Sequence, residues 1–442
     1  MQVSASAATL NDRLTGRALT VWSAGILAYI LAITGRTSLG VAGVEAMDHF
    51  GISASRLAVF SSVQVGVYAL AQIPTGMLID RLGPRRMLVV GALMMGVGQV
   101  LLGATGSYPV AILARVIIGS ADATAFLSVM RILPAWIPMR RTPLFTQLTG
   151  SLGYIGQFIS AVPFTALLHA HGWEVSFVSL GATSVLVAVL VWAAVRDTPT
   201  QRDGSGTSAA ETGMRNGNGP GIAGVLSFVL HQPACWLGFF IHFTLMSQVV
   251  FTLLWGKPLM TLGMGLSDAR ASAVLVINMV VSVLVGPLAG IISARSGRRR
   301  PFVALGATVV VALSWVVFFL PDAPRGFAAV IAMNIILPAM GPVANFGFDT
   351  VREEIDRRFT ATATGLSNMG GFVAAMVASQ AVGFILDASS DSGDYTWDDF
   401  RYAWFVAVGA VWVVGVLGLL VSRRAMTRWR AGRDAQTVTV RQ

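Results

Sequence analysis

Residues 76–86 of the chain read GMLIDRLGPRR, and residues 290–300 read GIISARSGRRR. The two stretches share a leading glycine, a second glycine seven residues later and a closing pair of arginines, and each follows a long apolar run. Repeats of this kind are typical of secondary transporters, which build a binding site between two related bundles of helices. The sequence therefore predicts two halves of similar architecture.

The composition is that of a membrane protein. Of the 442 residues, 55% are hydrophobic and 12% are charged, and the mean hydropathy is +0.70. A soluble domain of this size would not tolerate so much apolar surface. Apolar runs of about 20 residues, enough to cross roughly 30 Å of hydrocarbon as helix, recur along the chain. We predict an all-α membrane protein with twelve transmembrane helices, over residues 19–43, 57–79, 87–106, 110–135, 144–168, 174–195, 235–256, 271–293, 301–320, 326–348, 361–387 and 400–421.

Hydrophobicity collapses between Arg196 and Gly221, where Gly, Ser and Thr dominate. Such a segment cannot bury enough apolar area to order itself, and it separates six expected spans from six. The expected organisation is an N-terminal tail over 1–18, a six-helix bundle over 19–195, a flexible linker over 196–222, a second six-helix bundle over 223–421 and a basic C-terminal tail over 422–442.

Basic residues gather on one side of this topology. If the N-terminus is cytoplasmic, 23 of the 31 Lys and Arg residues lie in cytoplasmic segments and five lie outside. The positive-inside rule then predicts a multi-pass protein of the cell (inner or plasma) membrane with both termini, the linker and the basic tail in the cytoplasm. The net charge of +10 reflects topology and contact with membrane lipids, so no nucleic-acid partner is expected, and we expect a monomer.

Arg36 in the first expected span and Asp122 in the fourth are charged residues inside apolar runs, where the chain has almost no other charge. A charge at such a place is costly unless it meets a partner, water or a ligand, so each is a candidate functional residue. Arg115 lies two helical turns before Asp122 and on nearly the same face. A carboxyl whose arginine is alternately close and drawn away can take up and release a proton. Proton coupling is one interpretation of Asp122, and a static ion pair with Arg115 is the alternative.

Arg36 has no acid in its own span. Its planar guanidinium suits a carboxylate or phosphate, so it predicts an anionic substrate; pairing with Asp122 across helices is the alternative. We expect no comparable buried charge in the second half, but it carries polar residues that either join helices or line a cavity. These are His242, Gln248, Asn278, Asn334, Asn345, Asn368 and Gln380.

The sequence shows none of the patterns typical of an enzyme. It has no nucleophile spaced with a base, no nucleotide-binding loop and no cluster of metal ligands. Cys235 is the only cysteine, and His169 and His171 read as a polar interfacial turn rather than a metal site. We therefore expect no enzyme and no cofactor other than the proton as coupling ion.

The first loop resembles the signature of the major facilitator superfamily, G-x-L-a-D-r-x-G-r-[kr]. A glycine lets two helices approach closely, an aspartate can be held by a helix N-terminus, and arginines can pair with it and with lipid phosphates. The second copy has Ala294 in place of the aspartate, so we expect no equivalent charge latch there. The resemblance implies a gating role for residues Gly76, Asp80, Arg81, Gly83, Arg85 and Arg86.

Shorter strings spread over the chain resemble the organic anion:cation symporters, a group that includes carriers of sialic acid, glutamate and sugar acids. They begin at Arg36 (RTSLGVA), Tyr68 (YALAQIPTG), Arg115 (RVIIGSADA), Trp255 (WGKPL) and Gly365 (GLSNMGG). The resemblance implies the major facilitator fold of two six-helix bundles.

Many members of that family place an acid just before the first-span arginine, where this chain has Gly35, so we expect a single coupling carboxylate. The predicted function is secondary active transport by alternating access, as proton-coupled symport of a small organic anion. Arg36, Tyr68, Gln157 and Asn368 are expected to bind the substrate, Asp122 to carry the proton and Arg115 to tune it. Proton-driven efflux of drugs or metabolites is the alternative, although Gly153 to Phe158 lack the G-P-x-x-G-G run common in drug:proton antiporters.

Overall fold

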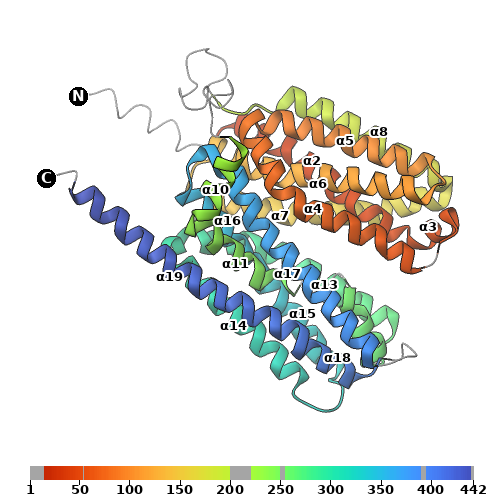
Figure 1. Cartoon of the computed structure of the whole chain (residues 1–442). Helices are drawn as coiled ribbons and strands as arrows, with labels where there is room; N and C mark the ends of the chain where they lie inside the picture. The colour runs from red at the N-terminus through yellow and green to blue at the C-terminus, as the bar shows by residue number, and fades with distance from the viewer. Residues whose placement is uncertain (1–13, 53, 200–220, 249–253, 390–394, 440–442) are drawn as a thin grey trace. The chain divides into compact units, whose positions relative to one another are not determined.

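The computed structural model describes residues 14–52, 54–199, 221–248, 254–389 and 395–439 (Figure 1). Every regular element in these ranges is a helix, which confirms the predicted all-helical class. Contacts divide the chain into two compact units. The first comprises residues 1–227 and 356–365, and the second comprises residues 228–355 and 366–442.

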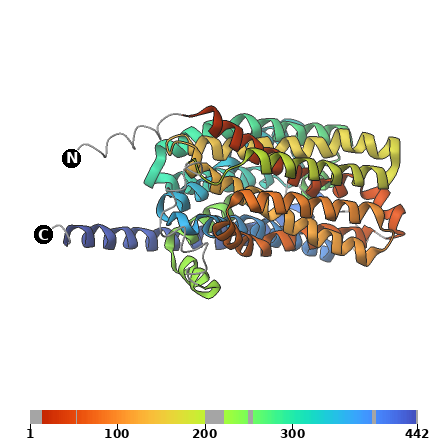
Figure 2. The same ribbon diagram turned by 90° about the horizontal axis from the view of Figure 1, so that it is seen from above.

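The first unit is built from long, nearly parallel helices, seen lengthwise in Figure 2. Helix α4 packs on α6, and α5 packs on both α6 and α8, while α2 lies against α6, α7 and α8. The elements are α2 (Gly16–Val41), α3 (Gly43–Phe50), α4 (Ala54–Leu82), α5 (Pro84–Ala104), α6 (Tyr108–Trp136), α7 (Thr142–Ile159), the π-helix η1 (Ser160–Phe164) and α8 (Thr165–Ala194), with the short η6 (Arg357–Phe359) and the start of α17.

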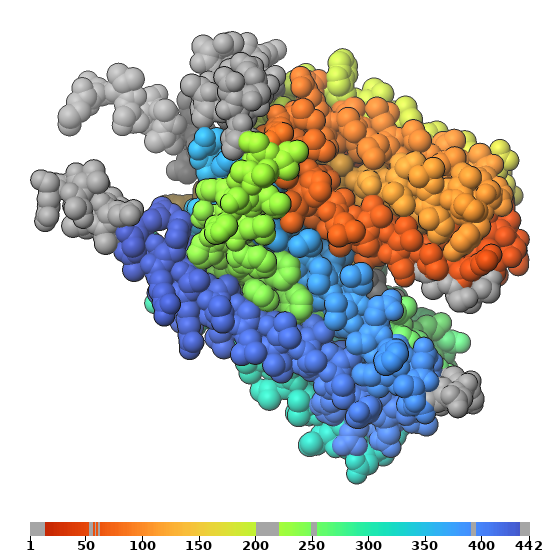
Figure 3. All heavy atoms as spheres, in the orientation of Figure 1, coloured from red at the N-terminus to blue at the C-terminus, as the bar shows by residue number. Residues whose placement is uncertain are grey.

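The second unit repeats this plan with more interruptions. Helix α11 packs on α16 and α19, and α13 packs on α15; Figure 3 shows α19 lying along the surface of this unit. Its elements are α11 (Pro233–Met246), α12 (Gly256–Pro258), η3 (Leu259–Gly263), α13 (Asp268–Ser296), η4 (Gly297–Arg299), α14 (Arg300–Phe319), α15 (Phe327–Met340), η5 (Gly341–Asn345), α16 (Phe346–Glu354), α17 (Thr360–Ser389), α18 (Trp397–Ala403), η7 (Trp404–Val408) and α19 (Gly409–Thr439). Helix α10 (Ile222–His231) spans the division between the units.

Nine helical segments in the described ranges are long and apolar enough to cross a membrane, or ten if the bent pair α10 and α11 forms one crossing. Two of the nine, Thr142–Ala194 and Asp268–Phe319, have 53 and 52 residues. Each is more than twice the roughly 20 residues that a crossing needs, and each covers two predicted spans. The chain is therefore a multi-pass membrane protein, and the count of twelve stays a prediction.

Helix α19 continues past the predicted end of the last span. That span was expected to end at residue 421 and to be followed by a basic tail, and α19 runs on as a helix to Thr439. Arg, Ala and Met favour helix and no Pro interrupts the run, so the loss of hydrophobicity marks the end of the apolar span without ending the helix. Most of the predicted N-terminal tail (1–13) and linker (200–220), and residues 440–442, lie outside the described residues.

The predicted orientation can be tested by thiol labelling. Ser205 lies in the predicted cytoplasmic linker and Ser392 in a predicted outer loop, and both lie outside the described residues. Cys235 is fully buried, so it should add little background. A membrane-impermeant reagent is expected to label Ser205→Cys only from the cytoplasmic side and Ser392→Cys only from outside, because the basic residues fix the topology. Labelling from the opposite sides would reverse the orientation.

Candidate functional site

The two charges that stand inside apolar runs meet in the first unit. Arg36 on α2 donates from Nε to Asp122 Oδ2 at 2.6 Å and from a terminal nitrogen to Oδ1 at 2.9 Å. The Asp122 side chain is fully buried, whereas that of Arg36 is 24% exposed. The pairing of Arg36 with Asp122, one of the alternatives that the sequence left open, is thus present. It uses the two-pronged geometry in which a guanidinium binds a carboxylate most strongly.

Tyr68 brings a third helix to this pair. It lies on α4 with 4% of its surface exposed, and its ring centroid is 4.6 Å from the guanidinium carbon of Arg36. A cation over an aromatic face is attracted by the ring quadrupole, more strongly when both are shielded from water. Helices α2, α4 and α6 therefore converge on the Arg36 guanidinium.

Arg115 lies near the pair but does not join it. Its side chain is buried, and one terminal nitrogen donates to the backbone carbonyl of Arg36 at 3.3 Å. Nε and the other terminal nitrogen have no hydrogen-bond partner, and no nitrogen of Arg115 lies within 4.0 Å of the Asp122 carboxylate. The alternative of a direct Arg115–Asp122 ion pair is therefore wrong for this structure. The buried cluster thus holds two guanidinium groups and one carboxylate, and two buried nitrogens of Arg115 have no hydrogen-bond partner.

The space beside Gly35 is filled by another helix. A Cβ at Gly35 would lie 2.5 Å from Met95 Sδ and 2.8 Å from Gln99 Nε2, both on α5. Gln99 Nε2 also donates to the Gly35 carbonyl at 3.1 Å. Glycine thus lets α2 approach α5 closely here, and a side chain at position 35 would have to displace the ends of Met95 and Gln99.

Hydroxyl groups line the neighbouring contact between α2 and α7. Thr37 Oγ1 lies 2.6 Å from Ser160 Oγ, and Thr34 donates to the Gly156 carbonyl at 3.1 Å. Ser160 begins the π-helix η1, a local widening that is common at functional sites. Gln157 is half-buried one turn before it, and its carbonyl accepts from Ser160. Gln157 thus stays a candidate on the same side of α2 as the Thr37 hydroxyl.

Asn368 lies in the second unit, where it is 3% exposed on α17. The structure therefore groups Arg36, Tyr68, Arg115 and Asp122 within one unit and describes Asn368 with the other. A substrate role for Asn368 and Gln157 stays a prediction.

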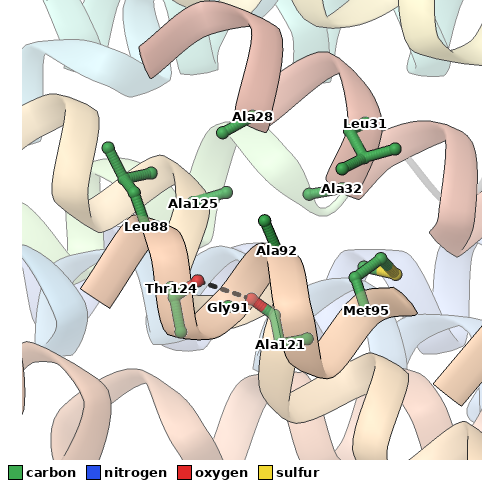
Figure 4. Close-up of a pocket in the computed structure, with 10 residues that line it drawn as sticks. All are labelled: Ala28, Leu31, Ala32, Leu88, Gly91, Ala92, Met95, Ala121, Thr124 and Ala125. Carbon is green, nitrogen blue, oxygen red and sulfur yellow. Dashed lines mark hydrogen bonds between the residues drawn. The ribbon is translucent and has the colours of Figure 1, made fainter. Parts of the chain in front are cut away.

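A small void lies between α2, α5 and α6 (Figure 4). Its volume is about 10 Å³, about the space of one water molecule, and its lining is mostly apolar. Gly91 packs directly against Thr124 at its edge, and Thr124 donates to the Ala121 carbonyl at 2.7 Å. This void is a gap in helix packing and is too small for a substrate.

Asp80 of the first loop is held by a helix N-terminus, as the sequence analysis expected of such an aspartate, and the helix is α17. Its Oδ1 accepts from the Ala361 amide at 3.0 Å, and Oδ2 accepts from the amide and hydroxyl of Thr362 at 2.8 and 2.7 Å. Gly76 permits this contact, because a Cβ there would lie 2.6 Å from Thr362 Cα. The carboxylate thereby satisfies amide groups that a helix start leaves without partners.

The ion-pair partner of Asp80 was missed by the sequence analysis. Arg131, at the end of the fourth expected span, places Nε 3.4 Å from Asp80 Oδ1. The Arg131 side chain is only 15% exposed, and a charge so near the end of an apolar run was the signal that could have revealed it. The sequence analysis had considered only the loop arginines as partners for Asp80.

The loop arginines make other contacts. Arg85 donates to the Trp192 carbonyl at 2.6 and 3.1 Å, and its amide donates to Asp197 at 2.9 Å. Gly83 has a positive φ of 88°, and Asp197 lies where a Cβ would stand. Arg81 is half-buried and Arg86 is exposed. The loop is thus fixed on one side by α8 and on the other by Asp80.

The expectation that the second half holds no buried charge comparable to Arg36 and Asp122 was wrong. Asp349 on α16 is fully buried, where it contacts Ser293 and forms an ion pair with Arg352. Arg300 is 2% exposed and binds Glu353 through two hydrogen bonds of 2.6 and 2.7 Å. The sequence analysis placed these residues in a loop, but α16 extends the tenth span as a helix that packs against its neighbours.

Just after α16, Asp356 caps the turn that leads into α17. The Arg358 side-chain hydrogen bond, with help from the Arg358 amide, holds the pKa of Asp356 below its usual range. This turn belongs to the first unit and leads directly to the amides that bind Asp80.

A helical membrane protein of two compact units, with a buried pair of opposite charges inside the first, has the organisation typical of secondary transporters. The family model "Major Facilitator Superfamily" matches residues 25–379. The chain belongs to the major facilitator superfamily and is not an enzyme.

Similar proteins include several named as carriers of organic anions. The chain is 25% identical over 409 residues to the "Probable sulfoacetate transporter SauU" of Cupriavidus necator, covering 91% of this chain and 93% of that one. It is 22% identical to the "Probable galactarate/D-glucarate transporter GudP" of Escherichia coli, covering 79% and 83%.

Among solved structures, the fucose:proton symporter of Escherichia coli matches 90% of this chain and 98% of its own with a TM-score of 0.66. The identity is 13%, so this likeness shows the fold alone.

Proposed function

We propose that the protein is a proton-coupled symporter of a small organic anion. The observation that carries the proposal is the arrangement of three charged residues in the first unit. The Asp122 carboxylate binds two nitrogens of the Arg36 guanidinium, which we call the Arg36 fork. Arg115 beside them has two nitrogens without a hydrogen-bond partner. An anion that binds Arg36 must compete with Asp122 for the same nitrogens.

This competition couples the proton to the anion. When Asp122 is protonated it loses its charge, and the two Arg36 nitrogens that bound it can bind a carboxylate or sulfonate instead. Proton and anion then favour each other's binding, and by linkage each raises the affinity of the other. The names of the related proteins, which include carriers of sulfoacetate and sugar diacids, agree with an organic anion as the substrate.

The alternative function, proton-driven efflux, uses the same carboxylate, but protonation then has the opposite effect on binding of the cargo. An antiporter binds proton and cargo at each other's expense, so acid should weaken cargo binding. The symporter proposal requires that acid strengthen it. The pH dependence of binding therefore separates the two functions without knowledge of the direction of transport.

The first experiment is a thermal-shift screen on purified protein with sulfoacetate, D-glucarate, inorganic phosphate and a cationic drug, each at two pH values. A ligand that binds the folded state stabilises it by mass action. We expect an organic anion to stabilise the protein more at the lower pH. Stabilisation by the cationic drug alone, or by the anion only at the higher pH, would contradict the symporter proposal. Uptake into proteoliposomes under an imposed proton or sodium gradient then identifies the coupling ion.

Asp80 is expected to act as a gate latch. Its bonds to the start of α17 form only while these segments are together, and an anion at a helix start is worth about 1 kcal/mol, enough to shift a balanced equilibrium several-fold. We expect Asp80→Asn to raise the inward-open population and to slow turnover while leaving substrate affinity within the open site unchanged. Distances between spin labels on the two predicted cytoplasmic faces measure this population.

Asp197→Asn is the matched control, because Asp197, just after the end of α8, binds the same loop and has no hydrogen bond to α17. Identical distance distributions for wild type and Asp80→Asn would show that Asp80 is no latch. Equal shifts for both variants would mean that the loop as a whole, rather than its contact with α17, sets the equilibrium.

A further inference from the structure

One end of the second unit carries arginines without acidic partners. Arg298 and Arg299 lie in η4, just before α14, and Arg424 lies on α19. Helices α14 and α19 pack together there, because the guanidinium carbon of Arg423 is 3.9 Å from the ring centroid of Phe302. Arg298, Arg299 and Arg424 are exposed and Arg423 is half-buried, and these four residues form what we call the α14–α19 basic cluster.

The glutamates at the end of α16 form ion pairs with other arginines. Glu353 binds Arg300, and Glu354 binds Arg430 at 2.6 Å and Arg433 at 3.6 Å. No described carboxylate lies within 4.0 Å of any member of the basic cluster. The cluster therefore presents positive charge that the protein does not neutralise.

The cluster continues two exposed apolar stripes. On α14, Phe302, Leu313 and Val317 are 53%, 58% and 57% exposed and follow Arg298 and Arg299 at helical spacing. On α19, Leu417 and Val421 are 58% and 64% exposed, and Arg424 comes one turn later on the same face. In a membrane protein such stripes face hydrocarbon, so the arginines lie where the hydrocarbon ends and the headgroups begin.

We propose that this cluster binds the headgroup of an anionic phospholipid, with the acyl chains along the apolar stripes of α14 and α19. Guanidinium groups bind phosphate oxygens through paired hydrogen bonds, and several arginines together prefer a lipid with net negative charge over a zwitterionic one. The apolar stripes below the cluster favour a lipid over a soluble phosphate, since a soluble anion would gain nothing from them. The bound lipid would hold α14 and α19 together on the predicted cytoplasmic side.

The test is native mass spectrometry of the full chain released from nanodiscs that contain equal amounts of phosphatidylglycerol and phosphatidylcholine. Wild type is expected to retain phosphatidylglycerol preferentially. The variant Arg299→Gln/Arg424→Gln should lower the retained ratio at least about tenfold, because each arginine near an anionic surface contributes roughly fivefold to binding. Both side chains are exposed, so the variant should keep its fold; its thermal unfolding in detergent checks this.

The matched control is Arg140→Gln/Arg141→Gln, which removes two exposed arginines from a predicted cytoplasmic loop of the first unit. It should retain the lipid as wild type does. An equal loss in the control, unchanged retention in the cluster variant, or equal retention of both lipids by wild type would overturn the proposal. Displacement of the lipid by free glycerol phosphate at millimolar concentration would reassign the cluster to a soluble anion and likewise overturn it.

Discussion

Replacing Asp122 with Asn is expected to abolish accumulation of substrate driven by a proton gradient while leaving exchange of substrate across the membrane measurable. The amide cannot take up and release a proton, and it leaves the Arg36 fork without its anion in every state. The measurement is uptake of the best-binding anion from the thermal-shift screen into proteoliposomes, with and without an inward proton gradient. We expect the variant to accumulate no more anion with the gradient than without it.

The same variant should also lose the pH dependence of anion binding, which a merely structural role for Asp122 would not remove. Glu174→Gln is a suitable control, because Glu174 is an exposed acid of the first unit and should change neither quantity. Asp122→Asn proteoliposomes that still concentrate the anion would show that another group carries the proton. A wild-type pH profile of binding in this variant would lead to the same conclusion.

Replacing Arg36 with Lys is expected to weaken anion binding by about ten- to a hundredfold with normal expression. Lysine keeps the charge but offers a point donor in place of the planar fork, so it loses at least one charge-assisted hydrogen bond, worth about 1.5–3 kcal/mol. It also loses the contact of the guanidinium with the Tyr68 ring, whose centroid is 4.6 Å from the guanidinium carbon. Calorimetric titration of the purified variant with the same anion measures the change.

Arg56→Lys is the matched control for this change. Arg56 also lies over a tyrosine ring, with its guanidinium carbon 5.4 Å from the centroid of Tyr108, but it is exposed and forms no part of the site. Wild-type affinity is expected for the control. If Arg36→Lys binds the anion as tightly as wild type, Arg36 serves to hold Asp122 and does not bind the substrate.

Much of the first-unit site followed from the sequence because burial of charge in a membrane is expensive. Arg36 and Asp122 could be picked out as isolated charges in apolar runs, and their pairing was one of the few arrangements open to them. That a helix start would hold Asp80 also followed, since an acid in a glycine-flanked loop and a helix start with free amides are complementary; in the structure the start of α17 does so.

The parts that escaped prediction depend on the exact ends of helices. Arg131 looked like a residue at the edge of a span until the structure showed it packed against Asp80. Asp349 was assigned to a loop because hydropathy ends where polar residues begin, whereas the helix continues and buries them. The same reason explains α19, whose last turns are polar and yet helical. Hydropathy locates the hydrocarbon core, but it does not locate the end of a helix.

The packing of Met95 and Gln99 against Gly35 limits how the transporter can be energised. If Asp122 alone carries protons, a singly charged anion crosses with one proton and no net charge, so its accumulation depends on the pH difference, about tenfold per pH unit, and not on the membrane voltage. An anion with two negative charges would move against an interior-negative voltage. A second proton would need a second carboxyl, and one at position 35 would place its Cβ 2.5 Å from Met95 Sδ and 2.8 Å from Gln99 Nε2. An acid there would therefore have to displace the ends of these two side chains on α5 before a singly charged anion could be driven by the membrane voltage.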